Sequence, residues 1–583
     1  MKIKYYKFAY ALAALMGLSS CGDFLEIEPQ DKIILDKFWN ERSDVESVVN
    51  TCYASLQSSA CIKRMIVWGE GRSETMTAGN NINKDLSLEN VFKADINSTN
   101  AYTSWVDFYY VINTCNTVIR YAPQVAEKDP GYTQGELKAH IAEMTALRAL
   151  CYFYLIRTFR DVPYTTDTYT DDDQEMALPA TPFETILDNL IADLERVQDD
   201  AVKYYPKTQP LYQTGRITQN AIHAMLCEMY LWKQDYQQCI NYADRVIKDM
   251  TDMIEENRKE SGSRVTVDEE MEGYPLTPTR SSGSMNSFGA EYSSIFGTGN
   301  DQETIFELVF MKNDDTQPAN GAIADFYGNS VNQMGFISAS SYVGGDVLQK
   351  QYKVYANQLD ARCYESVNSG LGTYSIGKYA CQYCNISVTG TAAASATVDY
   401  MLMGYYPEKH VQANWIVYRL TDIMLMKAEA LSQLMSDGVA DGTDPEQDAL
   451  DKDYRNQAFR IVSVINKRAL CQYPRKDILK EDDYKTKSDI ENLVLDERRR
   501  ELMFEGKRWY DLVRRSRRDG NTDYLRQQST AKYSSNKSLV ESKLTRMEAI
   551  YWPYNNDELK VNPFLVQNPA FGTGLNDSYE QAK

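Results

Sequence analysis

The chain has 583 residues, of which 43% are hydrophobic and 25% charged, so its composition excludes a disordered, collagen-like or small disulfide-rich protein. Its formal net charge of -20 argues against nucleic acid as a partner, because a nucleic-acid binder needs a basic surface to meet phosphates. Tyrosine outnumbers phenylalanine by 42 to 18, and we interpret most of the tyrosines as half-buried helix positions and a few as ligand platforms.

Residues 1–20 are predicted to be a secretory signal peptide. Three lysines precede an uncharged stretch from Phe8 to Leu18, which has the length of a signal-peptide core and is too short to span a bilayer. The next residues, LSSCG at 18–22, resemble the lipobox of bacterial lipoproteins. The resemblance implies that Cys21 becomes the first mature residue and carries lipid chains that anchor the protein to a membrane. The alternative is a chance cysteine after a plain signal peptide.

Ten further cysteines are scattered along the chain and do not form the pattern of a disulfide framework. Cys151 and Cys227 lie in apolar helical surroundings, where a thiol acts as a small hydrophobic group. Cys381 and Cys384 form a lone CxxC without a second pair, so zinc is disfavoured. A disulfide and two unpaired thiols both stay open for this pair.

Helical periodicity predicts the first long elements. Residues Glu136–Phe159 repeat apolar side chains at helical spacing and end before Pro163. A second helix is expected from Thr181 as N-cap, with Pro182 in the first turn and apolar residues at three-and-four spacing as far as Leu194.

Two pairs of helices resemble tetratricopeptide hairpins. The first covers Arg216–Ile247, with a break near Lys233–Tyr236, and the second consists of Tyr418–Leu434 and Tyr454–Leu470. Such hairpins cannot bury their apolar faces singly and must stack. The predicted fold is therefore mainly α, a scaffold of tetratricopeptide-like helical hairpins covered on one side by irregular loops with few short strands.

Residues 251–345 differ from the rest of the chain. They are rich in glycine, serine and asparagine and contain one convincing strand, Glu303–Phe310. Eight aromatic residues outside this strand argue against a solvated linker, so we expect ordered loops laid over the helices.

The sequence has no recognisable catalytic or metal motif. His140, His223 and His410 are far apart and outside any HExxH pattern, and there is no phosphate-binding loop or nucleophile elbow. Among 82 acidic residues a glycosidase pair can always be nominated, so acidic pairs carry no information. We predict a protein that is not an enzyme and has no cofactor. Calcium, if bound, is expected to be structural or ligand-bridging, although the Asp171–Asp173 run is better interpreted as a solvated loop.

The stretch DERRRELMFEGKRWYDLVR at 496–514 is the most specific motif. It predicts one helix with close ion pairs, Asp496 with Arg500, Arg498 with Glu501 and Glu505 with Arg508. It also resembles the E-R-R-x-E-L-x-F-E-G-x-R-x-x-D-L signature of the RagB/SusD family of outer-membrane nutrient-binding lipoproteins. The matching residues are Glu497, Arg498, Arg499, Glu501, Leu502, Phe504, Glu505, Gly506, Arg508, Asp511 and Leu512. Lys507 replaces the histidine often found in the motif, and we regard the motif as scaffold.

The resemblance extends from the CGDFLE start at 21–26 to the closing segment with Trp552-Pro553 and Asn562-Pro563. It implies a single SusD-like domain over 21–583, with a helical part at about 22–250, irregular ligand loops at about 251–415 and a C-terminal helical part at about 416–583. It implies a lipid-anchored protein in the outer membrane that faces the cell exterior. There it would bind an oligosaccharide or polysaccharide and cap a SusC-like TonB-dependent transporter as a hinged lid.

Sugar binding requires aromatic platforms and oriented hydrogen-bonding side chains. We expect them in two loop regions, with these candidate residues: Trp68, Arg72, Asn80, Phe288, Tyr292, Tyr327 and Tyr342. Trp105, Trp415 and Trp509 are assigned to the scaffold. A surface glycoside hydrolase and a tetratricopeptide scaffold that binds only protein are the competing hypotheses, and the sequence does not identify the ligand.

Overall fold

The computed structural model describes the following residues: 38–171, 173–260, 271–281, 284–310, 319–331, 333–344, 353–370, 373–390, 396–437, 444–472, 476 and 478–572. The predicted signal peptide and Cys21 lie outside them.

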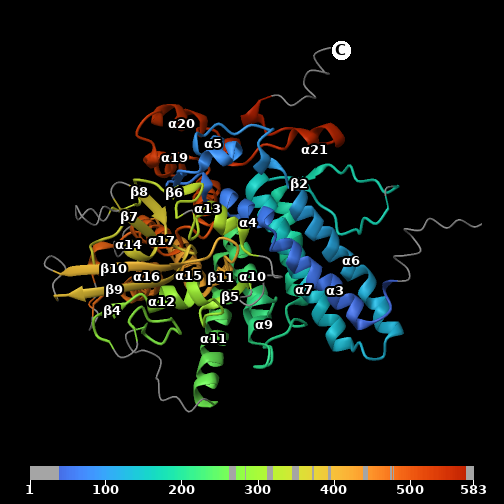
Figure 1. Ribbon diagram of the computed structural model, residues 1–583, viewed down its shortest axis with the longest axis horizontal. Helices are drawn as coiled ribbons and strands as arrows, with labels where there is room; N and C mark the ends of the chain where they lie inside the picture. Colours follow the sequence, from blue (N-terminus) through green and yellow to red (C-terminus); the bar gives the residue numbers. More distant parts are fainter. Residues whose placement is uncertain are drawn as a thin grey trace, which may run out of the picture.

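Antiparallel pairs of long helices build the scaffold, as Figure 1 shows. Helix α6 (Val106–Lys128) packs on α7 (Gln134–Phe159), α10 (Gln219–Lys233) on α11 (Tyr236–Glu260), and α15 (Leu420–Leu434) on α16 (Pro445–Arg468). Neighbouring pairs are joined by contacts of α11 with α15, while α3 (Arg42–Leu56) covers α6 and α8 (Phe183–Val197) covers α7. The predicted mainly helical fold is confirmed.

The remaining helices, most of them shorter, surround this scaffold. They are α4 (Ser59–Ile66), α5 (Leu86–Phe92), α9 (Pro210–Gly215), α12 (Ala290–Tyr292), α13 (Gly321–Phe326), α14 (Arg362–Glu365), α17 (Lys487–Leu502), α18 (Arg508–Asp519), α19 (Asp523–Ser529), α20 (Lys537–Lys543) and α21 (Asn556–Val561).

Helix ends follow local chemistry. Helix α7 begins after Thr133, whose hydroxyl accepts from the Glu136 N–H while the Glu136 carboxylate accepts from the Thr133 N–H. The break between α10 and α11 falls at Gln234, which has φ 65° and ends α10 in the left-handed region. The predicted N-cap Thr181 is wrong, because the first N–H of α8, on Phe183, donates to Asp161 Oδ1 at 3.0 Å instead.

In the part of the chain that the structure describes, the strands form sheets of two or three strands. The antiparallel pairs are β1 (Met76–Ala78) with β6 (Ile337–Ala339), β2 (Val162–Pro163) with β3 (Ala180–Thr181), β5 (Thr304–Leu308) with β11 (Trp415–Arg419), and β7 (Val367–Gly370) with β8 (Thr373–Ile376). The three-stranded sheet has the order β10 (Thr397–Tyr405), β9 (Cys381–Thr389), β4 (Ser287–Phe288).

The predicted strand near residue 304 is confirmed as β5, but the prediction that helix α15 starts at Tyr418 is wrong. Tyr418 and Arg419 belong to strand β11, in which Tyr418 pairs with Phe306 of β5, and α15 begins at Leu420. The long β9–β10 hairpin, on the left in Figure 1, was not predicted.

Tyrosines of the hairpins lie in the core, as predicted. Tyr152 and Tyr154 of α7 and Tyr230 and Tyr242 of the next pair are buried, and so are Trp105, Trp415 and Trp509. The ten cysteines from Cys52 to Cys471 are all buried with free thiols, so Cys381 and Cys384 are unpaired. No helix within the described ranges is long and apolar enough to cross a membrane.

Candidate functional site

The motif at 496–514 forms two helices joined by a tight turn, so the prediction of one helix is wrong. Helix α17 ends at Leu502 and α18 begins at Arg508. Between them Phe504 and Gly506 adopt positive φ angles of 69° and 70°, which interrupt a right-handed helix. The turn packs against another backbone segment, since a Cβ built on Gly69 would lie 1.7 Å from Gly506 O.

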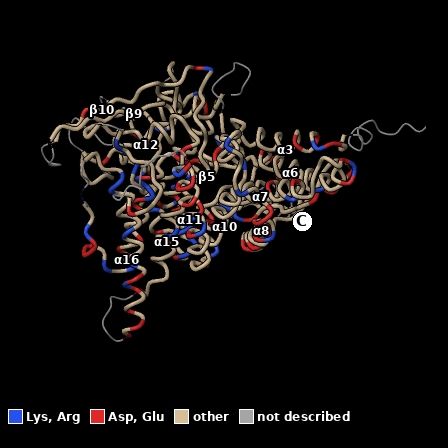
Figure 2. The backbone as a smooth tube through the Cα atoms, turned by 90° about the horizontal axis from the view of Figure 1, so that it is seen from below, with Lys and Arg blue, Asp and Glu red and all other residues tan. Residues whose placement is uncertain are grey.

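The charged side chains of the motif pair with distant segments. Glu501 binds Arg362, Arg419 and Arg468, at N–O distances of 3.0 and 2.7 Å for the first two. Burial opposes ionisation of Glu501, yet the arginines around it lower the pKa of its carboxyl well below the ordinary value. Glu505 binds Lys378 at 2.6 Å, and Arg419. Figure 2 shows basic and acidic positions intermixed in the interior near β5.

Other pairs replace the ion pairs that the motif predicted. Arg498 binds Asp422 and Asp511, and Arg508 binds Glu74, because these buried side chains point into the protein, where a carboxylate needs close cations to offset its lost hydration. Asp496 is partly exposed and binds Arg499, one turn along the same helix, instead of Arg500.

The turn of the motif holds the segment that follows α4. The buried carboxylate of Glu70, in η1 (Val67–Gly71), accepts from the N–H groups of Phe504 and Gly506 at 2.7 and 2.8 Å. Burial raises the pKa of Glu70 to about 7. Four residues later, Glu74 Oε1 lies 2.7 Å from Arg508 Nη2. The motif thereby fixes the chain that leads into strand β1.

Strand β1 brings together the two loop regions predicted to carry ligand contacts. Met76 of β1 pairs with Ala339 of β6, and Ala78 pairs with Ile337. Just beyond, Gly79 N donates to Phe336 O at 2.7 Å. The backbone at Gly335, just before β6, lies very close to the backbone at Phe326. A Cβ added to Gly335 would lie 2.1 Å from Phe326 O, so only glycine fits at this position.

Polar side chains gather at this end of the β1–β6 pair. We call this surface the asparagine platform and define it as Lys63, Asn80, Asn81, Asp325 and Gln333. Asn80 and Gln333 are exposed, Asn81 Nδ2 donates to Met334 O at 2.7 Å, and Lys63 Nζ lies 2.6 Å from Asp325 Oδ2. The platform offers amide groups from the segments beside β1 and β6, an ammonium group from α4 and a carboxylate from α13, which suits a ligand rich in hydroxyl groups.

Four predicted contacts are core residues, so their assignment as platforms is wrong. Trp68, Phe288, Tyr292 and Tyr327 are each at most 1% exposed and present no ring face to a ligand. Their polar atoms are satisfied internally: Trp68 Nε1 donates to Tyr102 O, and the hydroxyl of Tyr327 donates to Phe504 O. Burial of these rings holds the loops onto the scaffold.

The other three predicted residues have different positions. Asn80 belongs to the asparagine platform. Arg72 is half-buried, donates to Ala549 O at 2.7 Å and lies 4.4 Å from the ring of Trp509, and burial lowers its pKa to about 9. Tyr342 is half-buried, with the Arg499 guanidinium 5.7 Å from its ring.

Sequence reasoning missed four of the five platform residues. The Asn80–Asn81 doublet after a short strand was an available signal, because asparagine next to a strand end favours an exposed turn. Lys63 and Asp325 carried no such signal, since their pairing depends on the tertiary fold. Within the described residues, no group of three His, Cys, Asp or Glu side chains is arranged to hold a metal ion.

Comparison with known proteins agrees with this architecture. The model of the SusD family matches residues 302–571, and a second family model, described as starch-binding and associating with the outer membrane, matches residues 23–231. The chain belongs to the SusD family. SusD family proteins are non-catalytic binding proteins, so this SusD-like chain is not an enzyme. By its family, it is a starch- or glycan-binding protein associated with the outer membrane.

Individual relatives of this SusD-family chain are distant in sequence. SusD-like protein P38 from Formosa agariphila is 24% identical over 525 residues, which cover 86% of this chain and 90% of that protein. SusD-like protein P25 from the same organism is 22% identical over 580 residues, covering 95% and 96%. A crystal structure of a SusD superfamily protein from Bacteroides vulgatus has a TM-score of 0.62 at 16% identity, covering 91% of this chain and 100% of that chain.

Proposed function

We propose that this SusD-family protein binds a glycan on the asparagine platform at the cell surface and delivers it to a SusC-like TonB-dependent transporter, on which it acts as a lid. Lipid on Cys21 would hold it in the outer membrane, facing the exterior. Of the seven predicted ligand contacts, only Asn80 enters this site, because the contacts of the other six lead into the protein.

The pairing of β1 with β6 is the observation that carries the proposed site. It joins residues about 260 positions apart into one surface, and the turn of the motif fixes the segment that leads into β1 through Glu70 and Glu74. Rigid polar groups bind a hydroxyl-rich ligand without the entropy cost of ordering flexible loops.

The test of glycan binding uses soluble protein that starts at Gly22. A glycan array followed by calorimetry is expected to find a ligand, and Asn80→Ala is expected to weaken its binding by roughly 5–10-fold through the loss of one or two hydrogen bonds. Asn385→Ala, at an exposed position of β9, is the matched control and should leave the affinity unchanged. Equal affinities of the two variants would contradict the proposed site.

The anchor and the transporter are tested in the native membrane. Cys21→Ser is expected to release the protein from the membrane fraction, and the unmodified protein is expected to co-purify with a large β-barrel protein. Retention of the Cys21→Ser variant in the membrane would refute the lipid anchor. Purification without any barrel would refute the lid role while leaving glycan binding untouched.

A further inference from the structure

A large groove lies apart from the asparagine platform. In Figure 1, α9 and α11 lie in the lower part of the view, whereas β6 and α13 lie higher, below α19 and α20. The groove runs between the loop before α10, the C-terminal half of α11 and the entry to β5, and its volume is about 740 Å³. Ligand sites typically enclose roughly 300–1,000 Å³, so the groove has room for a short oligosaccharide.

Tyrosines form one rim of this depression. We call it the tyrosine groove, lined among others by Tyr204, Tyr205, Gln213, Asn220, Asn257 and Thr304. Tyr204 is 38% exposed. The ring of Tyr205 lies edge-on to that of Tyr212, with 5.6 Å between centroids. Exposed tyrosine rings beside amide side chains are the groups that bind apolar faces and hydroxyls of a sugar together.

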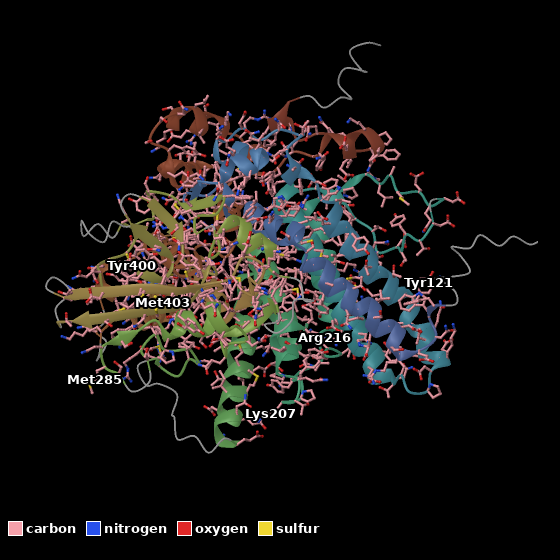
Figure 3. All side chains as sticks on the ribbon, in the orientation of Figure 1. Tyr121, Lys207, Arg216, Met285, Tyr400 and Met403 are labelled. Carbon is pink, nitrogen blue, oxygen red and sulfur yellow. The ribbon has the colours of Figure 1, made fainter. Side chains whose placement is uncertain are left out.

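The rim is held in place from below. Glu143 binds Arg216 with an oxygen–nitrogen distance of 2.6 Å, and the Arg216 guanidinium lies 5.9 Å from the ring of Tyr205 and 5.4 Å from that of Tyr212. The Tyr205 N–H donates to Gln213 Oε1 at 2.9 Å. Figure 3 marks Arg216 and, on the loop near the lower part of α11, Lys207. The rings are therefore preorganised, which lowers the cost of binding.

Two polar atoms of the lining have no partner. Asn220 Oδ1 and Thr304 Oγ1 make no hydrogen bond to the described residues, and their side chains belong to residues only 6% and 5% exposed. A buried polar atom without a partner costs about 1–3 kcal/mol, and native proteins contain few of them. A ligand hydroxyl can donate to the Asn220 oxygen and exchange a hydrogen bond with the Thr304 hydroxyl.

Three of the four charged side chains that line the groove, Lys207, Glu260 and Asp301, already have polar partners. Lys207 and Glu260 form an ion pair across it. Asp301 accepts from the hydroxyls of Thr277 and Ser294. A charged ligand would gain little from these groups, whereas a neutral ligand leaves them paired.

We propose that the tyrosine groove is a second binding site, for a neutral oligosaccharide that stacks on Tyr204 and Tyr205 and hydrogen-bonds to Asn220 and Thr304. The inference rests on the proposed glycan-binding function and adds a site that the family signature does not touch. Two separate sites on one protein would let it hold a long glycan at two points, which raises the effective affinity.

Four neutral probes test the groove: maltohexaose, cellohexaose, xylohexaose and mannohexaose. Amide hydrogen exchange of the soluble protein with each probe reports where it binds, and we expect protection at 204–213 and 250–257. Tyr204→Ala is expected to weaken calorimetric binding roughly tenfold. Tyr110→Ala, at a 58% exposed tyrosine of α6 outside the groove, is the matched control and should change nothing.

Thr304→Val separates a ligand contact from a structural role. It removes a hydroxyl that has no partner among the residues that the structure describes, so the free energy of unfolding should stay equal or rise, while probe affinity falls roughly fivefold. Unchanged affinity in both Tyr204→Ala and Thr304→Val would overturn the groove. Protection from hydrogen exchange that is confined to residues 77–81 and 325–336 would refute binding in the groove and support binding on the platform. Absence of binding by all four probes would overturn the groove and count against the proposed function as well.

Discussion

Removal of the buried Arg508 guanidinium should lower the free energy of unfolding far more than the loss of an ordinary surface charge. Arg508 is 2% exposed, and its Nε and Nη2 both contact Glu74 Oε1, at 2.9 and 2.7 Å. In Arg508→Met, Glu74 stays fully buried, with Arg499 as its remaining cation at 3.4 Å. Stranding one member of a buried ion pair costs about 3–5 kcal/mol, which is the expected loss in the free energy of unfolding.

The double variant distinguishes this cause from a simple loss of packing. Glu74→Met alone strands Arg508 and should cost a similar amount. Arg508→Met with Glu74→Met together places two apolar side chains of similar size in contact, and Arg499 keeps Asp496 as its partner at 2.8 Å. We expect the double variant to be more stable than the sum of the single losses predicts by at least about 2 kcal/mol.

Denaturant unfolding at pH 7 measures all three variants. The matched control is the exposed pair of Asp523 and Arg526, where the same substitutions should change the free energy of unfolding by no more than about 0.5 kcal/mol. Additive losses at Glu74 and Arg508, within about 0.5 kcal/mol, would refute the argument that charge compensation decides the role of this pair.

Three further predictions address the core, the pH response and the platform. Trp68→Ala should cost about 3–5 kcal/mol of unfolding free energy without changing glycan affinity of the folded protein; the opposite pattern would restore a ligand role for this ring. Burial raises the pKa of Glu307 to about 7 in the folded protein. The stability that comes from this bound proton is therefore fully present below pH 4.5 and is lost as the pH rises through 7. Glu307→Gln should therefore reduce the fall in stability between pH 5 and pH 8 by up to about 3 kcal/mol, and identical pH profiles would contradict this. Gly335→Ala forces its Cβ against Phe326 O and should weaken glycan binding on the platform more than binding in the tyrosine groove, which hydrogen exchange resolves by region.

The long helices could be predicted because their cause is local. Residues of α7 and of the α10–α11 pair carry apolar side chains at helical spacing, and the chain breaks where the pattern breaks. The β9–β10 hairpin also had a local signal, since Tyr383, Asn385, Ser387 and Thr389 alternate with buried positions. That alternation lies inside the region of about 251–415 that was predicted to form irregular loops, so the hairpin was not predicted.

The ligand residues were harder to predict because exposure is a tertiary property. Glycine-rich sequence predicts loops, but it does not predict whether the aromatic rings of those loops face solvent or the core. In the structure the hydroxyl of Tyr292 donates to Gly377 O and Cys381 O, so its ring fastens one loop to another. The rim tyrosine Tyr204 stays exposed in a loop that has no glycine-rich character.

The charges of the motif explain why spacing alone could not identify their partners. On an isolated helix, a cation three or four residues away is the nearest partner, and each such pair stabilises by only about 0.2–0.5 kcal/mol. Burial changes the balance, because a carboxylate such as Glu501 that loses its hydration needs several close cations, whichever segment supplies them. Arg362, Arg419 and Arg468 come from three different elements and meet at this one carboxylate. A motif of this kind therefore identifies a family through the tertiary contacts it requires, and in this chain those contacts hold the strand that leads to the proposed glycan site.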